Sequence, residues 1–286
     1  MPADRRAGSP WIRFVALLPV VCSQAASPDP ADLVRKSLAA ENENAKRARD
    51  YTFIQRTEDR ELDAQGNVKS RKSKTHDVTM LEGSSYRRLI QRDDRPLPPE
   101  EEKVEQFKLQ KSIEDRRRET AEQRARRLAD YDKRPGRNKA MLAEIPEAFD
   151  FHLRGEETVE GRPVYVIDAT PRRGYRPRNS QARLFLPKLK ATLWIDKGDL
   201  GWVRVQAEVI DTISVGLFLL RLSKGASVEM RQSRVNDEVW LPNRVLMSAA
   251  ARIGLVKKLN IQQEMSFSNF RKFQTGARVV SSSEIR

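Results

Sequence analysis

The stretch that decides the fold runs from Ala191 to Gln206 and reads ATLWID, then KGDLG, then WVRVQ. Its two outer segments are rich in β-branched and aromatic residues, which favour strands. Two glycines between them, Gly198 and Gly201, allow the positive φ angles that a tight reversal requires. The stretch therefore predicts an antiparallel hairpin, and we expect the rest of the chain to be organised around it.

Apolar and polar residues alternate along the second strand of this hairpin. One face is expected to carry the apolar residues Val203, Val205, Ala207 and Val209. The other face is expected to carry Arg204, Gln206 and Glu208. A period of two with one polar face is typical of an antiparallel sheet that packs on one side and meets water on the other. Nothing in the hairpin indicates catalysis, so function is expected in what the sheet wraps around.

The same kinds of pattern predict elements along the rest of the chain. A helix is predicted from Asp29 to Asp50, where Leu33, Val34 and Leu38 recur at helical spacing. Further strands are predicted at 51–55, 68–81, 85–92, 149–153, 162–169, 228–235, 239–249 and 259–270, with a turn region at 155–161. The apolar run at 209–222 is too short for a membrane span and is either core or a flap at the mouth of a cavity.

A highly charged segment from Glu100 to Arg134 interrupts the strands. It contains 11 Lys or Arg and 10 Asp or Glu residues and almost no strand former. A near-neutral mixture at this density predicts one exposed helix with i,i+4 ion pairs, which Pro135 and Gly136 end. The segment is either a solvated helix or a lid or arm that contacts a partner.

The chain of 286 residues carries a net charge of +14, which raises nucleic acid as a partner. Aromatic residues, however, are scattered singly among the strands rather than grouped on a basic stacking surface. Outside the cytoplasm a basic surface meets anionic lipid head groups or acidic proteins. The net charge is the one feature of the sequence that favours nucleic-acid binding. We therefore predict that the protein does not bind nucleic acid.

Residues 1–25 are predicted to be a signal peptide. Arg5, Arg6 and Arg13 supply its positive region, and residues 14–22 form an apolar run too short to span a bilayer. Small residues at 23 and 25 suit signal peptidase, so we expect a periplasmic protein with at most peripheral membrane contact. Cys22, the single cysteine, is a less favoured alternative as a lipid anchor.

No motif for catalysis, a metal or a cofactor is evident. The two histidines, His76 and His152, lie far apart, and neither has a second histidine or a cysteine at metal-ligand spacing. No Gly-x-Ser-x-Gly, phosphate loop or Gly-x-Gly-x-x-Gly occurs. We therefore predict a binding protein that is not an enzyme and uses no cofactor.

Three strand motifs carry a resemblance to a known family: LWID at 193–196, WVRV at 202–205 and VWLP at 239–242. With the export signal, N-terminal helix, meander and helical insertion before them, they resemble the LolA/LolB-like superfamily of periplasmic outer-membrane lipoprotein-sorting proteins. The resemblance covers residues 31–273 and is strongest at 184–246. It implies an α+β fold, an antiparallel half-open β-barrel with an N-terminal helix and a helical lid, as a single domain over 31–286.

The resemblance also implies a function: a carrier that holds lipid or lipoprotein acyl chains in an apolar hollow. The residues expected to line that hollow lie on apolar faces of the central strands: Leu193, Ile195, Val203, Val205, Val209, Phe218, Val228, Met230, Met265 and Phe267. For each of these residues the alternative is that it packs against the helices. The alternative function is that of an envelope-stress sensor or regulatory protein, which uses the same fold to bind a protein partner.

Overall fold

The computed structural model describes residues 27–215, 220–253 and 257–273. The first half contains α1 (Pro30–Ala48), β1 (Tyr51–Leu62), β2 (Val68–Leu81), β3 (Ser84–Arg92), β4 (Arg95–Pro96), α2 (Pro99–Arg117), α3 (Ala121–Leu142) and α4 (Ile145–Ala148). The second half contains β5 (Phe149–Val159), β6 (Arg162–Pro171), α5 (Ser180–Phe185), the 3-10 turn Leu186–Lys188, β7 (Leu189–Asp196), β8 (Trp202–Val209), β9 (Ile213–Val215), β10 (Leu220–Leu222), β11 (Ser227–Val235), β12 (Val239–Ile253) and β13 (Lys257–Lys272).

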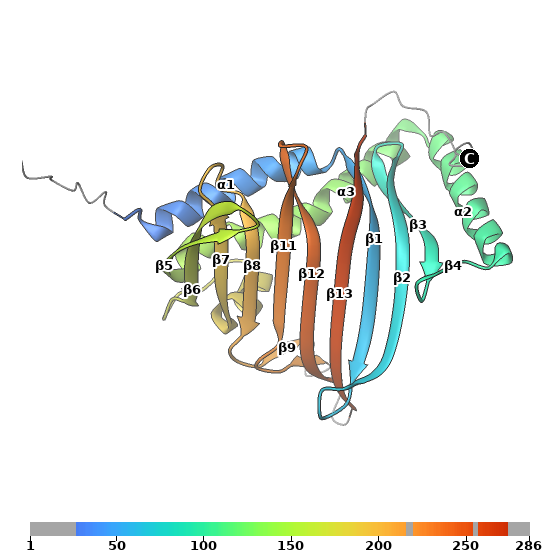
Figure 1. Cartoon of the computed structure of the whole chain (residues 1–286). Coiled ribbons are helices and arrows are strands. Elements are labelled where there is room, and N and C mark those ends of the chain that lie inside the picture. Colours follow the sequence, from blue (N-terminus) through green and yellow to red (C-terminus); the bar gives the residue numbers. More distant parts are fainter. Residues whose placement is uncertain (1–26, 216–219, 254–256, 274–286) are drawn as a thin grey trace, which may run out of the picture.

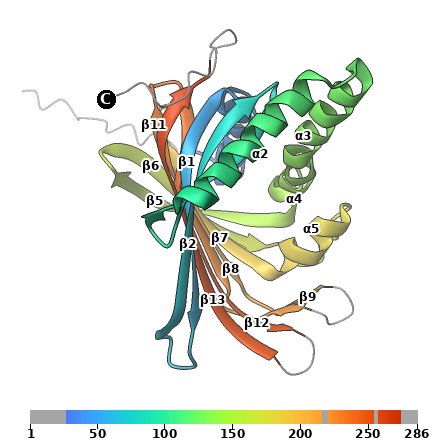
Figure 2. The same ribbon diagram turned by 90° about the vertical axis from the view of Figure 1, so that its right-hand side faces the viewer.

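One antiparallel sheet contains thirteen strands of the described chain, and eleven of them follow the order β4-β3-β2-β1-β13-β12-β11-β8-β7-β6-β5 (Figure 1). Strands from the two ends of the chain, β1 and β13, pair along almost their whole length and join the two halves. The end strands β4 and β5 do not pair with each other, so the sheet is open. The helices lie on one side of it (Figure 2), which confirms the predicted α+β class.

Helix α1 begins as the sequence predicts because Asp29 accepts hydrogen bonds from the backbone N–H groups of Ala31 and Asp32. Its buried residues Leu33, Val34 and Leu38 pack on the sheet in a core with Ile167, Leu193, Ile195 and Trp202. The Trp202 indole N–H donates to the Ser37 hydroxyl oxygen at 3.0 Å, so the polar edge of the ring is satisfied inside this core. This contact fixes α1 over the β7–β8 hairpin.

The hairpin contains a β-bulge that the alternating pattern does not reveal. Ile195 pairs with Trp202 and Trp194 pairs with Arg204, which leaves Val203 as the extra residue. Trp202 packs beneath α1, whereas Val203 packs with Trp194 in a core on the opposite face. The prediction that Val203 shares a face with the later valines of β8 is therefore wrong.

The two glycines of the hairpin turn act differently from the prediction. Neither Gly198 nor Gly201 has a positive φ angle, and Leu200 adopts the left-handed conformation instead, with φ of 60°. Gly201 is required for space, because a Cβ atom there would lie 2.2 Å from the indole nitrogen of Trp240. The close approach of β8 and β12 at this point depends on the missing side chain.

The charged insertion forms two helices rather than the single helix that composition predicts. The break lies between Arg117 and Ala121, where the Thr120 side chain accepts from the Gln123 N–H and the Gln123 side chain accepts from the Thr120 N–H. This reciprocal pair is a capping box, which begins a new helix. Helix α3 also continues beyond Pro135 to Leu142, so the predicted end of the insertion is wrong.

Two further predictions are corrected in the second half of the chain. Residues 155–159, expected in a turn, continue β5 past an irregularity at Gly155, and the turn lies at Glu160 and Gly161. The apolar run at 209–222 contains the strands β9 and β10, and Ile213 within it is fully buried in a core with Val209 and Ala226. That part of the run is core.

Candidate functional site

A row of apolar side chains crosses the helix-covered face of the sheet. Leu193 of β7 pairs with Val205 of β8, which pairs with Met230 of β11. Met230 pairs with Val245 of β12, and Val245 pairs with Met265 of β13. Directly paired residues of antiparallel strands point to the same face, so five apolar side chains from five adjacent strands lie side by side.

Burial decreases along this row away from α1. Leu193 is 5% exposed and lies in the core beneath α1, and Val205 and Met230 pack at the edge of that core. Val245 and Met265 are half-buried. In Figure 1 helix α3 crosses behind this part of the sheet, and in Figure 2 it lies on the same side as α1. The sheet therefore presents half-buried apolar residues on its helix-covered side, beyond the core that α1 covers.

A second row runs beside the first. Its members on β7, β8, β11 and β12 are Ala191, Ala207, Val228 and Met247. Phe267 adds to the apolar surface on β13, and the centroid of its ring lies 5.5 Å from that of Phe53. We call the half-buried residues Val205, Val228, Met230, Val245, Met247, Met265 and Phe267 the apolar band.

The apolar band ends at β13 and β1. Met265 pairs with Thr57 of β1, and Met247 pairs with the polar Gln263 of β13. Beyond Thr57, the first row continues with Lys74 of β2. Beyond Gln263, the second row continues with Asp59 of β1 and Lys72 of β2. The band therefore covers the middle of the sheet and stops at the start of the N-terminal meander.

The ten residues predicted from the sequence fall into different places. Val205, Val228, Met230, Met265 and Phe267 belong to the apolar band. Leu193 and Ile195 are buried beneath α1, Val209 is buried beside α5, and Val203 lies on the opposite face. Phe218 lies outside the described residues. That these residues line a ligand site stays a prediction, and sequence reasoning missed Val245 and Met247 of β12.

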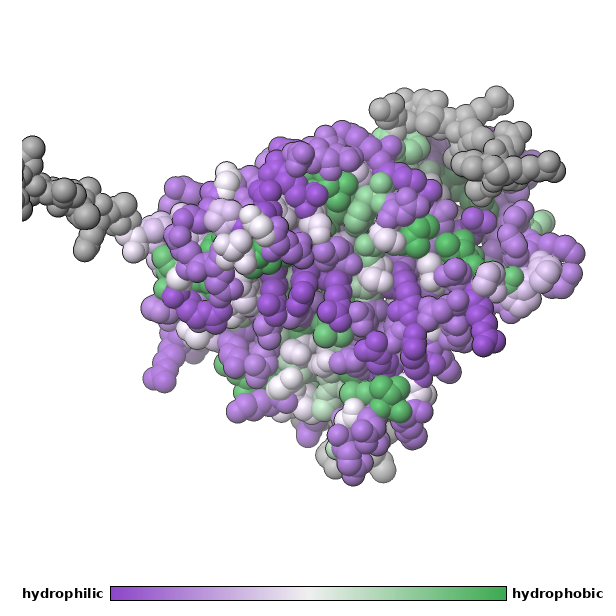
Figure 3. All heavy atoms as spheres, in the orientation of Figure 1, coloured by the Kyte–Doolittle hydropathy of each residue, from purple (hydrophilic) through white to green (hydrophobic). Residues whose placement is uncertain are grey.

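The opposite face, which no helix of the described ranges covers (Figure 2), carries charged side chains across the same strands. The space-filling view of this face is mainly hydrophilic (Figure 3). Glu229 accepts from Arg204 and Arg231, both at 2.6 Å, and Glu264 accepts from Arg244 at 2.7 Å. On this side of the sheet, acidic and basic residues alternate across β8, β11, β12 and β13, beside the apolar core of Trp194, Val203 and Trp240.

Glu58 is the centre of this charged face. Its side chain is only 2% exposed, and it accepts from Arg56, from Arg60 at 2.5 Å and from Arg71 at 2.9 Å. Burial raises the pKa of the carboxyl group, but the hydrogen bonds from Arg56 and Arg60 outweigh it and the net shift is downward. Glu58 therefore stays ionised and links β1 to β2.

Two pockets lie away from the apolar band. One, of about 330 Å³, is formed by β6, β7 and β8 around Asp168, Thr192 and Gln206. The other, of about 490 Å³, lies between β3 and the two helices of the insertion. Neither pocket is lined by any of the ten predicted residues.

The described residues contain no group of three or more His, Cys, Asp or Glu side chains that could hold a metal ion. No helix within the described ranges has the length and apolar character needed to cross a bilayer. His76 is half-buried beside Arg87 and Lys74, and burial together with these cations lowers its pKa. These surroundings disfavour the protonated form, although the charge of Glu105 partly opposes the shift.

Comparison with known proteins gives likenesses of structure only. No family model and no curated protein matches the chain. Among solved structures it is similar to a domain described as an outer membrane lipoprotein-sorting protein from Vibrio parahaemolyticus, with TM-score 0.35 and 14% identity over 86% of this chain and 95% of that chain. It is also similar to a LolA superfamily protein from Nitrosomonas europaea, with TM-score 0.33 and 9% identity over 87% and 94%.

A third similar structure is the Pseudomonas aeruginosa MucA/MucB complex, with TM-score 0.25 and 12% identity over 83% of this chain and 99% of that chain.

Proposed function

We propose that this protein is a periplasmic, non-enzymatic carrier that binds an acyl chain of a lipid or lipoprotein along the apolar band, beneath α3. The observation that carries the proposal is the continuous row from Leu193 to Met265, which passes from full burial under α1 to partial burial away from it. A sheet that needed only a packed core would place such residues beneath a helix or exchange them for polar ones, as it does on the opposite face.

The chemistry of the apolar band suits a flexible hydrocarbon. Its two kinds of side chain are branched aliphatic residues and methionines, with a phenylalanine at one end. Methionine is unbranched and adapts to irregular contacts. Burial yields about 0.8 kcal/mol per methylene, so a chain of about twelve methylenes gives roughly 10 kcal/mol before the cost of immobilisation is subtracted.

Two adjacent residues of β12 provide a matched test. Val245 belongs to the apolar band, while Leu246 is similarly half-buried on the charged face between Glu229 and Glu264. We expect Val245→Gln to weaken binding of a fluorescent fatty acid by about tenfold, since a polar amide enters the apolar row. Leu246→Gln should leave the affinity unchanged. Equal effects of the two substitutions, or no saturable binding by the unaltered protein, would refute the proposal.

A second candidate function is the binding of a protein partner, and helix α2 favours it. None of its residues is buried, and Val104 and Phe107 on its outer side are 51% and 69% exposed. Large apolar side chains at this exposure are typical of interaction surfaces. In this case Phe107→Ser should abolish capture of a partner from an envelope extract and leave fatty-acid binding intact.

A further inference from the structure

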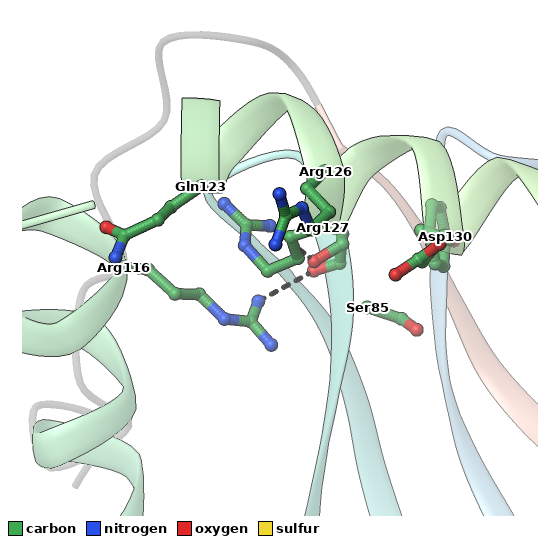
Figure 4. A pocket seen from close by; sticks show the side chains of 8 residues that line it. Ser85, Arg116, Gln123, Arg126, Arg127 and Asp130 are labelled. Atoms are coloured by element: carbon green, nitrogen blue, oxygen red, sulfur yellow. Dashed lines mark hydrogen bonds between the residues drawn. The ribbon is translucent and has the colours of Figure 1, made fainter. Parts of the chain in front are cut away.

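The pocket of about 490 Å³ lies where the corner between α2 and α3 meets the turn that joins β2 to β3. Residues of β3, α2 and α3 line it: Ser85, Arg116, Gln123, Arg127, Asp130 and Tyr131. Figure 4 shows the Arg116 side chain reaching from its helix toward Arg127 on the other. The turn lies close against α3, since a Cβ atom on Gly83 would lie 3.1 Å from the Leu128 side chain, and Arg127 of α3 donates to the Glu82 carbonyl oxygen at 3.1 Å. The walls of the pocket are therefore fixed by packing as well as by charge.

Arg116 is the main cation of this pocket. Its Nη1 donates to the carbonyl oxygens of Leu81 at 2.6 Å and Ser84 at 3.1 Å, which orients the guanidinium group. Among the described residues no carboxylate lies within ion-pair distance of it. Burial and the neighbouring charge of Arg127 lower the pKa of Arg116. A half-buried cation held beside a second cation would be stabilised by an anion.

The neighbouring carboxylates Glu119 and Glu82 act on Arg116 and meet this demand only in part. Arg127 is neutralised by Glu119, with two contacts of 2.6 Å. Arg126 pairs with Glu122 on the surface at 3.3 Å, where both side chains are more than three-quarters exposed and the pair is weak. Asp130 lies across the pocket from Arg116 (Figure 4) and has an interaction of its own.

Uncharged donors surround the remaining space. Gln123 uses its side-chain oxygen to accept from the Thr120 N–H, which leaves its amide N–H groups for the pocket. Ser85 and Tyr131 add hydroxyl groups to the lining. Several donors around a guanidinium fork match a group with three or more acceptor oxygens better than they match a carboxylate.

We infer that this pocket binds a phosphate group, held by Arg116 and Gln123. The inference rests on the proposed function in one respect, because in a phospholipid this phosphate would be the head group of the chain held by the apolar band. Helix α3 connects the two places, since its first turns line the pocket and its last residue, Leu142, packs against the same core as Val205 and Met230. A free phosphate or small phosphate ester offers the same chemistry without the chain.

Two substitutions test the site, so that the result does not depend on a single variant that could fail to fold. Arg116→Gln removes the cation, and Arg118→Gln, at a side chain 81% exposed on the same helix end, is its charge-matched control. Gln123→Glu places a negative charge in the pocket but preserves the capping box, in which glutamate is also favoured. Thermal unfolding checks that both pocket variants fold.

The probes are glycerol 3-phosphate, dihexanoyl phosphatidic acid and dihexanoylglycerol, each titrated by calorimetry. We expect Arg116→Gln and Gln123→Glu to weaken both phosphate probes at least tenfold, about 1.4 kcal/mol, and Arg118→Gln to have no effect. If phosphatidic acid binds more tightly than glycerol 3-phosphate, the phosphate group bound in the pocket is that of a lipid head group. Equal affinity identifies a free phosphate ester and supports the pocket without the carrier function.

Two results would overturn the inference. One is that neither phosphate probe binds the unaltered protein. The other is that phosphatidic acid and dihexanoylglycerol bind equally well to the unaltered protein and to both pocket variants. In that second case the apolar band still binds acyl chains, so the carrier function stands while the phosphate site fails.

Discussion

Replacing Glu58 with glutamine should destabilise the protein strongly at neutral pH. The Glu58 carboxylate is almost fully buried and accepts from three arginines. Glutamine has a single acceptor oxygen, and its amide N–H groups would face guanidinium donors. Hydrogen bonds to charged groups contribute about 1.5–3 kcal/mol each, but the arginines are a quarter to a half exposed and water screens part of that loss. We expect a loss of roughly 2–4 kcal/mol in the free energy of unfolding.

The pH dependence of this loss follows from the direction of the pKa shift. Because folding lowers the pKa of Glu58, its stabilisation is fully present above the unfolded pKa, about 4.3, and is lost as pH falls through the folded value. The difference in stability between the unaltered protein and Glu58→Gln should therefore shrink progressively below about pH 4.

Urea unfolding at pH 7 and at pH 3, followed by tryptophan fluorescence and circular dichroism, measures both effects. Glu61→Gln is the control on the same strand, since Glu61 is 42% exposed and its contact with Lys69 is 3.8 Å long. This control should change stability by less than about 0.5 kcal/mol. A similarly small effect of Glu58→Gln at pH 7, or an effect that persists unchanged at pH 3, would refute the reasoning.

Two further predictions concern the contacts that fix the sheet. Ser37→Ala should lower the free energy of unfolding by about 1–2 kcal/mol, measured by urea unfolding, because the buried Trp202 indole N–H loses its acceptor. An unchanged free energy of unfolding would show that the hydroxyl is not needed. Gly201→Ala should lower the free energy of unfolding by about 2 kcal/mol or more, toward the upper end for overpacked cores, because the new Cβ atom would overlap the Trp240 indole. An unchanged midpoint of urea unfolding would contradict the packing described.

Residue patterns predicted most strands because the signals for strands are local. Segments such as 162–169 and 228–235 combine β-branched residues with turn residues at their ends, and the structure confirms both as strands. Helix α1 was predictable for the same reason, since Asp29, Pro30 and a helical repeat of apolar residues lie together. The predicted open antiparallel sheet with an N-terminal helix and a helical insertion is confirmed on this basis.

The errors arise where the outcome depends on contacts between distant segments. The bulge that turns Val203 away depends on how Trp194 packs against Trp240 of β12, which no period of two reveals. The polar side of the sheet was predicted from β8, but the ion pairs across its strands were not, because Glu58 and Glu264 come from opposite ends of the chain and meet only through β1 and β13. The break between α2 and α3, in contrast, had a local signal in the Thr120-x-x-Gln123 pattern that charge composition obscured.

The candidate site was predictable only in part. Val205, Val228, Met230, Met265 and Phe267 lie in the apolar band, as an apolar face on central strands would place them. Which apolar residues are buried beneath α1 and which remain half-buried depends on where that helix ends on the sheet. Sequence periodicity carries no information about that position.

Native mass spectrometry, combined with lipid extraction, of the protein purified from its own cells tests the central claim most directly. We predict a bound species of lipid or acyl-chain mass that is released on denaturation and is depleted in Val245→Gln but retained in Leu246→Gln. A folded protein that carries no such species, and that acquires none when incubated with lipid, would contradict the carrier function.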